Sequence, residues 1–268
     1  MTPSTTDGRA GPGRGTDVAR RPPLRSLRPR PGTPPHRMEI MTPRRLYQGT
    51  GPGPITPDGC SVEYYTTLTP RGEPELVHDA IPAGASILEL GAGVGRITHR
   101  LLELGHEVVA VDESPEMLAH IRGAETVCSP IQTLALPRTF DLVLLMSFVI
   151  ETADDDLRAA FLRTCGAHVS ADGCVILQRQ PPEWYDTVQP FERDAGPGHT
   201  VSMTRVSRPA PGLLDATMEY TIGERRWTQT FVSHRLDDDR LEHELNQAGL
   251  TVSGFLDGDR GWVRATPL

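Results

Sequence analysis

The stretch Ser86-Ile87-Leu88-Glu89-Leu90-Gly91-Ala92-Gly93-Val94-Gly95-Arg96-Ile97 decides the fold. Its apolar run at residues 86–90 predicts a buried strand, three glycines follow at alternating positions, and a helical pattern begins at Arg96. Glycine is needed where the backbone turns sharply or approaches a ligand closely, because a Cβ would clash there. A strand that runs through a glycine turn into a helix N-terminus is typical of a cradle for a small polar ligand.

The spacing of these glycines limits the classes of ligand that the turn can bind. A dinucleotide fingerprint has its third glycine one position later than Gly95, where this chain has Arg96. A Walker-type phosphate loop requires a lysine, and the sequence contains none. The lack of lysine also excludes Schiff-base chemistry and pyridoxal enzymes.

A second strand is predicted at residues 107–112, after a helix over residues 96–104 that Gly105 ends. The strand finishes in Asp112, and an acid at this place accepts hydrogen bonds from a ribose hydroxyl. Nicotinamide dinucleotide enzymes use the same carboxylate. Asp112 alone therefore does not discriminate between nucleoside cofactors.

The acid Glu89, one intervening residue and Gly-x-Gly-x-Gly together resemble the first motif of class I S-adenosylmethionine-dependent methyltransferases. The segment from Asp141 to Ser147 resembles the fourth-strand motif of that family. The resemblance covers about residues 60–268. It implies an α/β, Rossmann-like fold: a seven-stranded, mostly parallel sheet with an antiparallel last strand, and a small antiparallel β lid.

The resemblance also implies the cofactor, S-adenosylmethionine, with S-adenosylhomocysteine as product. In this family the glycine turn lies under the methionine and ribose, and the acid after the second strand holds both ribose hydroxyls. Pro130 stands where many members have an aspartate for the adenine, so that contact is expected from the next two residues instead. The residues expected to bind the cofactor are Glu89, Gly91, Ala92, Gly93, Gly95, Asp112, Glu113, Met117, Ile131, Gln132, Met146 and Ser147.

Candidate catalytic side chains come from three places. Tyr64 or Tyr65 matches a tyrosine that folds over the cofactor in many small-molecule methyltransferases. Glu151 follows the fourth strand, where it would orient an amine or simply begin the next turn, and His234 is a candidate general base. Each is equally explained by packing, as are the other candidate pocket residues Trp184, Tyr185, His199 and Trp227.

Composition divides the chain into four parts. Residues 1–57 are rich in Gly, Pro, Arg and Thr and lack apolar periodicity, which predicts a disordered tail. The cofactor-binding core is expected over residues 58–180. An antiparallel lid is expected over residues 181–235, and a last helix and hairpin over residues 236–268 complete the core.

Charge and cysteine content limit the classes of partner, the metal sites and the cellular location that the sequence predicts. The net charge is −8, and the first 60 residues carry ten arginines and four acids, so the remainder is near −14. An acidic folded part argues against nucleic acid as a partner. The four cysteines are scattered without a Cys-x-x-Cys pair, which gives no metal signature and suits a reducing, cytoplasmic location. No apolar run is long enough for a membrane span, and a monomer or homodimer is expected.

The expected reaction is in-line SN2 transfer of a methyl group to a nitrogen or oxygen atom of a small molecule. The Lys-Asp-Lys-Glu tetrad of ribose methyltransferases cannot form without lysine, and no Asn/Asp-Pro-Pro-Tyr/Phe motif is found. These absences favour a small-molecule acceptor. The Ala-, Gly-, Pro- and Arg-rich composition suggests a GC-rich bacterial genome. The expected lid resembles that of small-molecule N-methyltransferases, including those that dimethylate amino sugars, and this resemblance implies a role in bacterial secondary metabolism. A non-catalytic S-adenosylmethionine-binding protein and an NAD-dependent oxidoreductase remain as alternatives.

Overall fold

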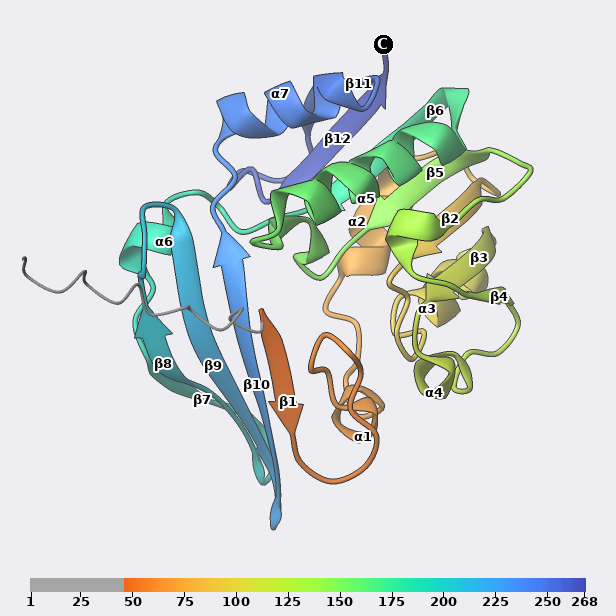
Figure 1. The fold of residues 1–268 in the computed structure, drawn as a ribbon. Coiled ribbons are helices and arrows are strands. Elements are labelled where there is room, and N and C mark those ends of the chain that lie inside the picture. Colours follow the sequence, from red (N-terminus) through yellow and green to blue (C-terminus); the bar gives the residue numbers. More distant parts are fainter. Residues whose placement is uncertain (1–45) are drawn as a thin grey trace, which may run out of the picture. The chain divides into compact units, whose positions relative to one another are not determined.

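The computed structural model describes residues 46–268, and a seven-stranded sheet forms its core (Figure 1). The strand order is β11-β12-β6-β5-β2-β3-β4, and every neighbouring pair is parallel except those that include β12. The mostly parallel sheet with an antiparallel last strand is therefore confirmed. The strands are β2 (Ser86–Leu90), β3 (Glu107–Asp112), β4 (Glu125–Cys128), β5 (Phe140–Leu145), β6 (Val169–Gln178), β11 (Leu250–Phe255) and β12 (Trp262–Pro267).

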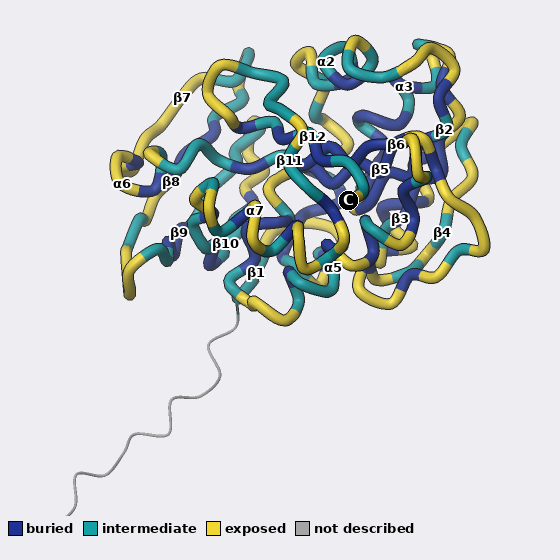
Figure 2. The backbone as a smooth tube through the Cα atoms, turned by 90° about the horizontal axis from the view of Figure 1, so that it is seen from above, coloured by how far each residue is buried: buried dark blue, intermediate teal, exposed yellow. Residues whose placement is uncertain are grey.

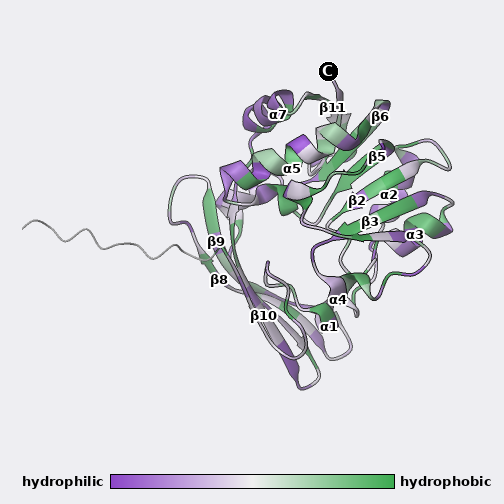
Figure 3. Cartoon of the chain, turned by 45° about the vertical axis from the view of Figure 1, so that its right-hand side comes forward, coloured by the Kyte–Doolittle hydropathy of each residue, from purple (hydrophilic) through white to green (hydrophobic). Residues whose placement is uncertain are grey.

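Helices cover both faces of this sheet, which explains why its strands are apolar throughout. Leu88 and Leu90 belong to the core cluster that holds α5 (Asp155–His168) and α7 (Asp238–Gln247). Ile87 belongs to the opposite cluster, with α2 (Glu73–Asp79) and α3 (Thr98–Glu103). Figures 2 and 3 show these central strands as buried and hydrophobic. The remaining short elements of the core are α4 (Pro115–Leu118), η1 (Ile131–Thr133) and η2 (Val149–Glu151).

Strand β2 lies at the point where the strand order reverses. The chain passes from β2 outward to β3 and β4, then returns to β5 on the other side of β2. In open α/β sheets, ligands bind beyond the carboxyl ends of the strands at such a switch point. The glycine turn follows β2 at this place.

A second, five-stranded antiparallel sheet, here called the lid sheet, has the order β1-β10-β9-β8-β7 (Figure 1). Its strands are β1 (Tyr47–Thr50), β7 (Phe191–Gly196), β8 (His199–Ser207), β9 (Leu213–Ile222) and β10 (Arg225–His234). Two one-turn helices accompany it, α1 (Val62–Tyr65) and α6 (Trp184–Thr187). Strands β7 to β10 lie within residues 181–235, where an antiparallel lid is expected, whereas β1 lies outside that range.

The boundary of the expected tail at residue 57 is wrong. Residues 46–57 include β1, which pairs with β10 in the register Tyr47↔Phe231. The segment then runs so close to itself that a Cβ on Gly49 would lie 2.1 Å from the Gly59 carbonyl oxygen. The rest of the expected tail, residues 1–45, lies outside the described part of the chain.

Two helix starts follow the rules of side-chain capping. The Ser114 hydroxyl accepts a hydrogen bond from the Met117 N–H at 3.2 Å and caps α4. The Asp154 carboxylate accepts from the Leu157 N–H at 3.0 Å and caps α5. Among the helices of residues 46–268, none combines the length and apolarity needed to cross a membrane.

Candidate functional site

The first two glycines of the turn leave space in front of them. Gly91 and Gly93 have φ of +73° and +57°, which is left-handed backbone that L side chains rarely adopt. A Cβ on Gly91 would meet no protein atom closer than 3.9 Å, at Val149, and then Ile131 at 4.0 Å. A Cβ on Gly93 would meet only the Met117 sulfur, at 4.0 Å. The turn therefore exposes bare backbone that a ligand can approach.

The third glycine of the turn, Gly95, allows neighbouring side chains to pack closely against the backbone. Gly95 is buried with φ of +83°, and a Cβ there would lie 2.9 Å from both His99 and Ile121. The turn itself is fixed to β3, because the Gly91 and Ala92 N–H groups both donate to the Val111 carbonyl, at 2.8 and 2.9 Å. Gly95 thus lets α3 begin close against the loop that follows α4.

Asp112 stands beside this turn at the end of β3. One carboxylate oxygen accepts from the Gly93 N–H at 2.8 Å and the other from the Ser114 N–H at 2.9 Å. Burial raises the pKa of the half-buried Asp112, and these two backbone donors oppose that rise. Each carboxylate oxygen has a further lone pair. The site can therefore accept hydrogen bonds from two vicinal hydroxyls.

Glu89 lies beneath the turn. Its side chain is 4% exposed and accepts a hydrogen bond from the Thr98 hydroxyl, at 2.6 Å, in the first residue of α3. Burial raises the pKa of Glu89 to about 7, and the nearby Asp112 charge raises it further. The two acids therefore sit on adjacent strands as predicted, but they face different surroundings.

The side of the site toward β4 carries the expected apolar residues. Met117 is 2% exposed and packs with Val94 of the turn and Val62 of α1. Ile131 is buried in η1, and its carbonyl accepts from the Thr164 hydroxyl at 2.9 Å. The other two predicted residues on this side, Glu113 and Gln132, are exposed.

Strained backbone marks the other side of the site, at the end of β5. Met146 is buried, whereas Ser147 and Phe148 are exposed and have φ of 57° and 62°. The Ser147 N–H donates to the Gln178 side chain at 2.9 Å, which holds this backbone to β6. Left-handed non-glycine residues concentrate at ligand sites. Two in succession therefore support a functional loop here.

The two tyrosines of α1 point to different neighbours. The Tyr64 ring stacks on Tyr220 of the lid sheet at 4.1 Å, and its hydroxyl lies 3.2 Å from Nε2 of His199. Tyr65 accepts a hydrogen bond from the Cys60 thiol at 3.2 Å and packs against the cluster that contains Met117. Of the pair, Tyr65 is thus the one next to the glycine turn.

The remaining lid aromatic residues are mainly packed. Trp227 is 1% exposed and donates its indole N–H to the Pro52 carbonyl at 2.9 Å. Tyr185 belongs to the lid's apolar cluster, against which Trp184 packs.

Two predicted catalytic side chains have other partners. His234 lies 3.5 Å from the Asp155 carboxylate and 2.8 Å from the Arg240 guanidinium, which places it in an ion network between α5 and α7. Burial lowers the pKa of His234, and the Arg240 charge lowers it further. Glu151 is 3% exposed, and its carboxyl accepts from the Gln180 N–H. The contacts of both residues thus favour a structural role over contact with an acceptor.

Sequence reasoning missed two residues near the site. Tyr47 of β1 interacts with Thr152 just after η2, and Gln229 of β10 donates to the Cys60 sulfur at 3.2 Å. No local signal identifies them, because each acts through a partner distant in sequence.

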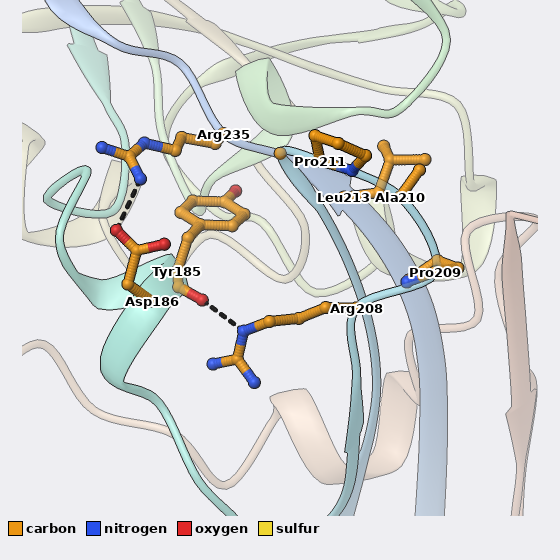
Figure 4. Close-up of a pocket in the computed structure, with 9 residues that line it drawn as sticks. Tyr185, Asp186, Arg208, Pro209, Ala210, Pro211, Leu213 and Arg235 are labelled. Atoms are coloured by element: carbon orange, nitrogen blue, oxygen red, sulfur yellow. Dashed lines mark hydrogen bonds and ion pairs between the residues drawn. The ribbon is translucent and has the colours of Figure 1, made fainter.

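A cavity of about 420 Å³ lies elsewhere, behind α6 (Figure 4). It contains no residue of the glycine turn, so it is not assigned to the cofactor. Its lining is Tyr185, Asp186, Arg208, Pro209, Ala210, Pro211, Gly212, Leu213 and Arg235.

Comparison with known proteins agrees with this geometry. A family model described as a methyltransferase domain matches residues 87–173. An uncharacterized methyltransferase of Mycobacterium bovis is 46% identical over 67 residues, which is 25% of this chain and 28% of that protein. A ubiquinone biosynthesis O-methyltransferase of Bradyrhizobium diazoefficiens is 25% identical over 109 residues, 38% of this chain and 42% of that protein. The chain thus covers well under half of these curated relatives.

Solved structures match over a greater length. An amino pentose methyltransferase of Micromonospora echinaspora, crystallised with S-adenosylmethionine, has a TM-score of 0.64 at 19% identity, covering 77% of this chain and 95% of that one. A sugar N-methyltransferase of Streptoalloteichus has a TM-score of 0.63 at 19% identity, covering 76% and 91%. At such identities the likeness concerns the fold. The domain match identifies residues 87–173 as a methyltransferase domain, and the structural likeness shows that the chain has the fold of these methyltransferases.

Proposed function

We propose that the protein transfers a methyl group from S-adenosylmethionine to a nitrogen or oxygen atom of a small molecule. The observation that carries the proposal is the open backbone at Gly91 and Gly93, next to a half-buried Asp112 carboxylate. That pair offers close approach and an acceptor for two hydroxyls, which is what a ribose needs. When bound, the cofactor supplies a methyl group already made electrophilic by its sulfonium.

The chain's own residues have three tasks in this proposal. Asp112 would hold the ribose, and the apolar surface of Met117 and Ile131 would face the adenine. The strained backbone at Ser147 and Phe148 would border the methionine end. Orientation of this kind can supply roughly 7–11 kcal/mol of the barrier.

Small-molecule specificity is supported by the lid sheet and by the acidic net charge. An amino sugar is the first acceptor to test, because two neighbours in structure are described as sugar or amino pentose methyltransferases. Natural-product biosynthesis in the cytoplasm is part of the same proposal. An amine acceptor needs only to lose a proton to water, whereas a hydroxyl benefits from a base with a pKa near neutrality.

Two experiments test the proposal in sequence. Isothermal titration with S-adenosylhomocysteine and with NADH should give binding to the nucleoside and none to the dinucleotide. The reverse result would replace a methyltransferase with an oxidoreductase. A radiolabelled-methyl screen of amines, phenols and sugars should then give a methylated product. Cofactor binding with no product over a broad panel would favour a non-catalytic cofactor-binding protein.

A further inference from the structure

Phe148 is a large apolar residue that lies exposed in the loop after β5. It is 38% exposed, whereas Ile150, two residues further along, is completely buried. Within residues 46–268, Phe148 belongs to none of the apolar clusters and has no aromatic or cationic neighbour over its ring. A single exposed apolar side chain needs no functional explanation. The backbone and the position of Phe148 give it one.

The backbone at Phe148 is strained. Its φ and ψ are 62° and 16°, and the preceding Ser147 has φ of 57°. Left-handed backbone is a genuine outlier for a bulky residue. The Ser147 N–H donates to the Gln178 side chain at 2.9 Å. The Phe148 carbonyl accepts from the Glu151 N–H, also at 2.9 Å. The structure thus keeps an exposed ring in a conformation that costs stability, which is typical of ligand-binding loops.

This loop borders the open face of the glycine turn. The Val149 side chain, next to Phe148, is the nearest protein group to a Cβ placed on Gly91, at 3.9 Å. Strand β5 pairs in parallel with β2, so the carboxyl ends of both strands meet at the edge of the sheet where ligands bind. Phe148 therefore stands at the proposed methionine end of the cofactor, where an acceptor has to approach the methyl group.

An unused hydrogen-bond donor lies beside Phe148. Gln178, half-buried at the end of β6, accepts the Ser147 N–H with Oε1, which identifies the other end of its amide as nitrogen. That Nε2 carries two N–H donors and has no partner within the described part of the chain. The C–H groups of a saturated ring suit the negative face of an aromatic ring. An aromatic face and an amide donor together therefore complement a saturated ring that carries an oxygen atom.

We propose that Phe148 and Gln178 select the acceptor: a saturated ring of the acceptor lies against the Phe148 ring, and an oxygen atom on that ring accepts a hydrogen bond from Nε2 of Gln178. The inference rests on the proposed function, because it places the acceptor at the same site. It adds a chemical class, a cyclic amine or alcohol with a ring oxygen substituent, and disfavours open-chain acceptors.

Three small amines separate the two contacts. The compound trans-4-aminocyclohexanol has a ring and a hydroxyl, cyclohexylamine has only the ring, and 4-amino-1-butanol has only the hydroxyl. Each is titrated by saturation-transfer-difference NMR against the full chain saturated with S-adenosylhomocysteine. In the wild type, loss of the ring should weaken binding roughly 3–10-fold. Loss of the hydroxyl should weaken it by about the same factor, because one hydrogen bond is lost.

Two variants remove the contacts separately. Phe148→Ala should bind trans-4-aminocyclohexanol and 4-amino-1-butanol equally. Gln178→Glu keeps an oxygen for the Ser147 N–H but has no donor, so it should bind trans-4-aminocyclohexanol and cyclohexylamine equally. Its added charge acts on all three amines alike and cancels in the ratio. Phe191→Ala is the control, since Phe191 is 39% exposed on the edge strand β7 and its loss should leave both preferences intact.

Phe148→Gly tests the strained backbone directly. It should have a higher midpoint of chemical denaturation than Phe148→Ala, because glycine adopts a left-handed φ without a Cβ clash. A wild type that binds ring and chain amines alike, a variant that keeps the preference it should lose, or equal midpoints would overturn the inference. If S-adenosylhomocysteine does not bind, the proposed function fails. The same ratios, measured on the protein alone, then still decide the inference.

Discussion

The space in front of the glycine turn leads to a prediction about Gly91→Ala. The new Cβ would lie 3.9 Å from Val149 and 4.0 Å from Ile131, which is ordinary van der Waals contact. It therefore clashes with no protein atom, but it occupies volume that the cofactor would use. We expect the variant to fold and to lose affinity for S-adenosylhomocysteine.

The magnitude has two parts. Placing alanine at φ +73° costs about 1–2 kcal/mol of stability, because the left-handed conformation disfavours a Cβ. The intruding methyl group should weaken cofactor binding by roughly 10–100-fold, about 1.4–2.8 kcal/mol. The first part is measured by chemical denaturation and the second by isothermal titration.

Gly84→Ala is the control, since the chain offers a second glycine at the same φ. Gly84 also has φ +73°, is exposed, and has nothing within 4 Å of its Cβ position. Both variants should lose similar stability, and only Gly91→Ala should lose affinity. Equal affinity in the two variants would refute the assignment of the cofactor to this turn.

Three further predictions concern buried or half-buried charges. Asp112→Ala should weaken S-adenosylhomocysteine binding by roughly 2–4 kcal/mol in isothermal titration, because it removes a charged acceptor from two hydroxyls. Unchanged affinity would place the ribose elsewhere. Glu89 keeps its proton to about pH 7 when folded but loses it near pH 4.5 when unfolded, so it lowers stability progressively as pH rises through this window. Glu89→Gln should remove this dependence of stability on pH, which amounts to up to about 3 kcal/mol in the free energy of unfolding measured by chemical denaturation across pH. The same pH dependence in wild type and variant would contradict the prediction. Arg158→Ala should cost about 3–5 kcal/mol in the same denaturation assay, because it removes a buried guanidinium that pairs with the partly buried Glu244 and donates to the Thr152 carbonyl, and leaves Glu244 with Arg240 alone; a loss below about 1 kcal/mol would contradict this.

The core of the fold could be predicted because its signals are local. A glycine turn after a short apolar run, and Asp112 at the end of the next one, indicate a parallel sheet and a nucleoside site. The Ser114 cap of α4 and strand β4 depend on equally local signals. The same residues predicted a methyltransferase, and a methyltransferase domain model matches residues 87–173.

What could not be predicted depends on partners distant in sequence. Strand β1 has four residues, YQGT, without apolar alternation, and it forms because β10 supplies its hydrogen bonds 180 residues later. The orientation of Tyr64 toward the lid and of Tyr65 toward the turn likewise depends on where β9 and α4 lie. His234, at the end of β10, showed no sequence sign of its ion network, since Asp155 comes from the distant helix α5 and the path of the chain from β10 into α7 decides where Arg240 lies.

Three acids that the sequence predicts to contact cofactor or acceptor differ in exposure, and this difference separates a structural role from a ligand-binding role. Glu89 and Glu151 are 4% and 3% exposed, and each is bonded to a neighbouring segment, at Thr98 and at Gln180. Asp112 is half-buried beside open backbone. We therefore expect substitutions of the first two to change stability and loop position, and substitution of Asp112 to change cofactor affinity. The chain thus holds its two site-forming loops from below with buried carboxyls whose pKa values burial raises, and leaves the ligand-facing surface to backbone N–H groups and the Asp112 carboxylate.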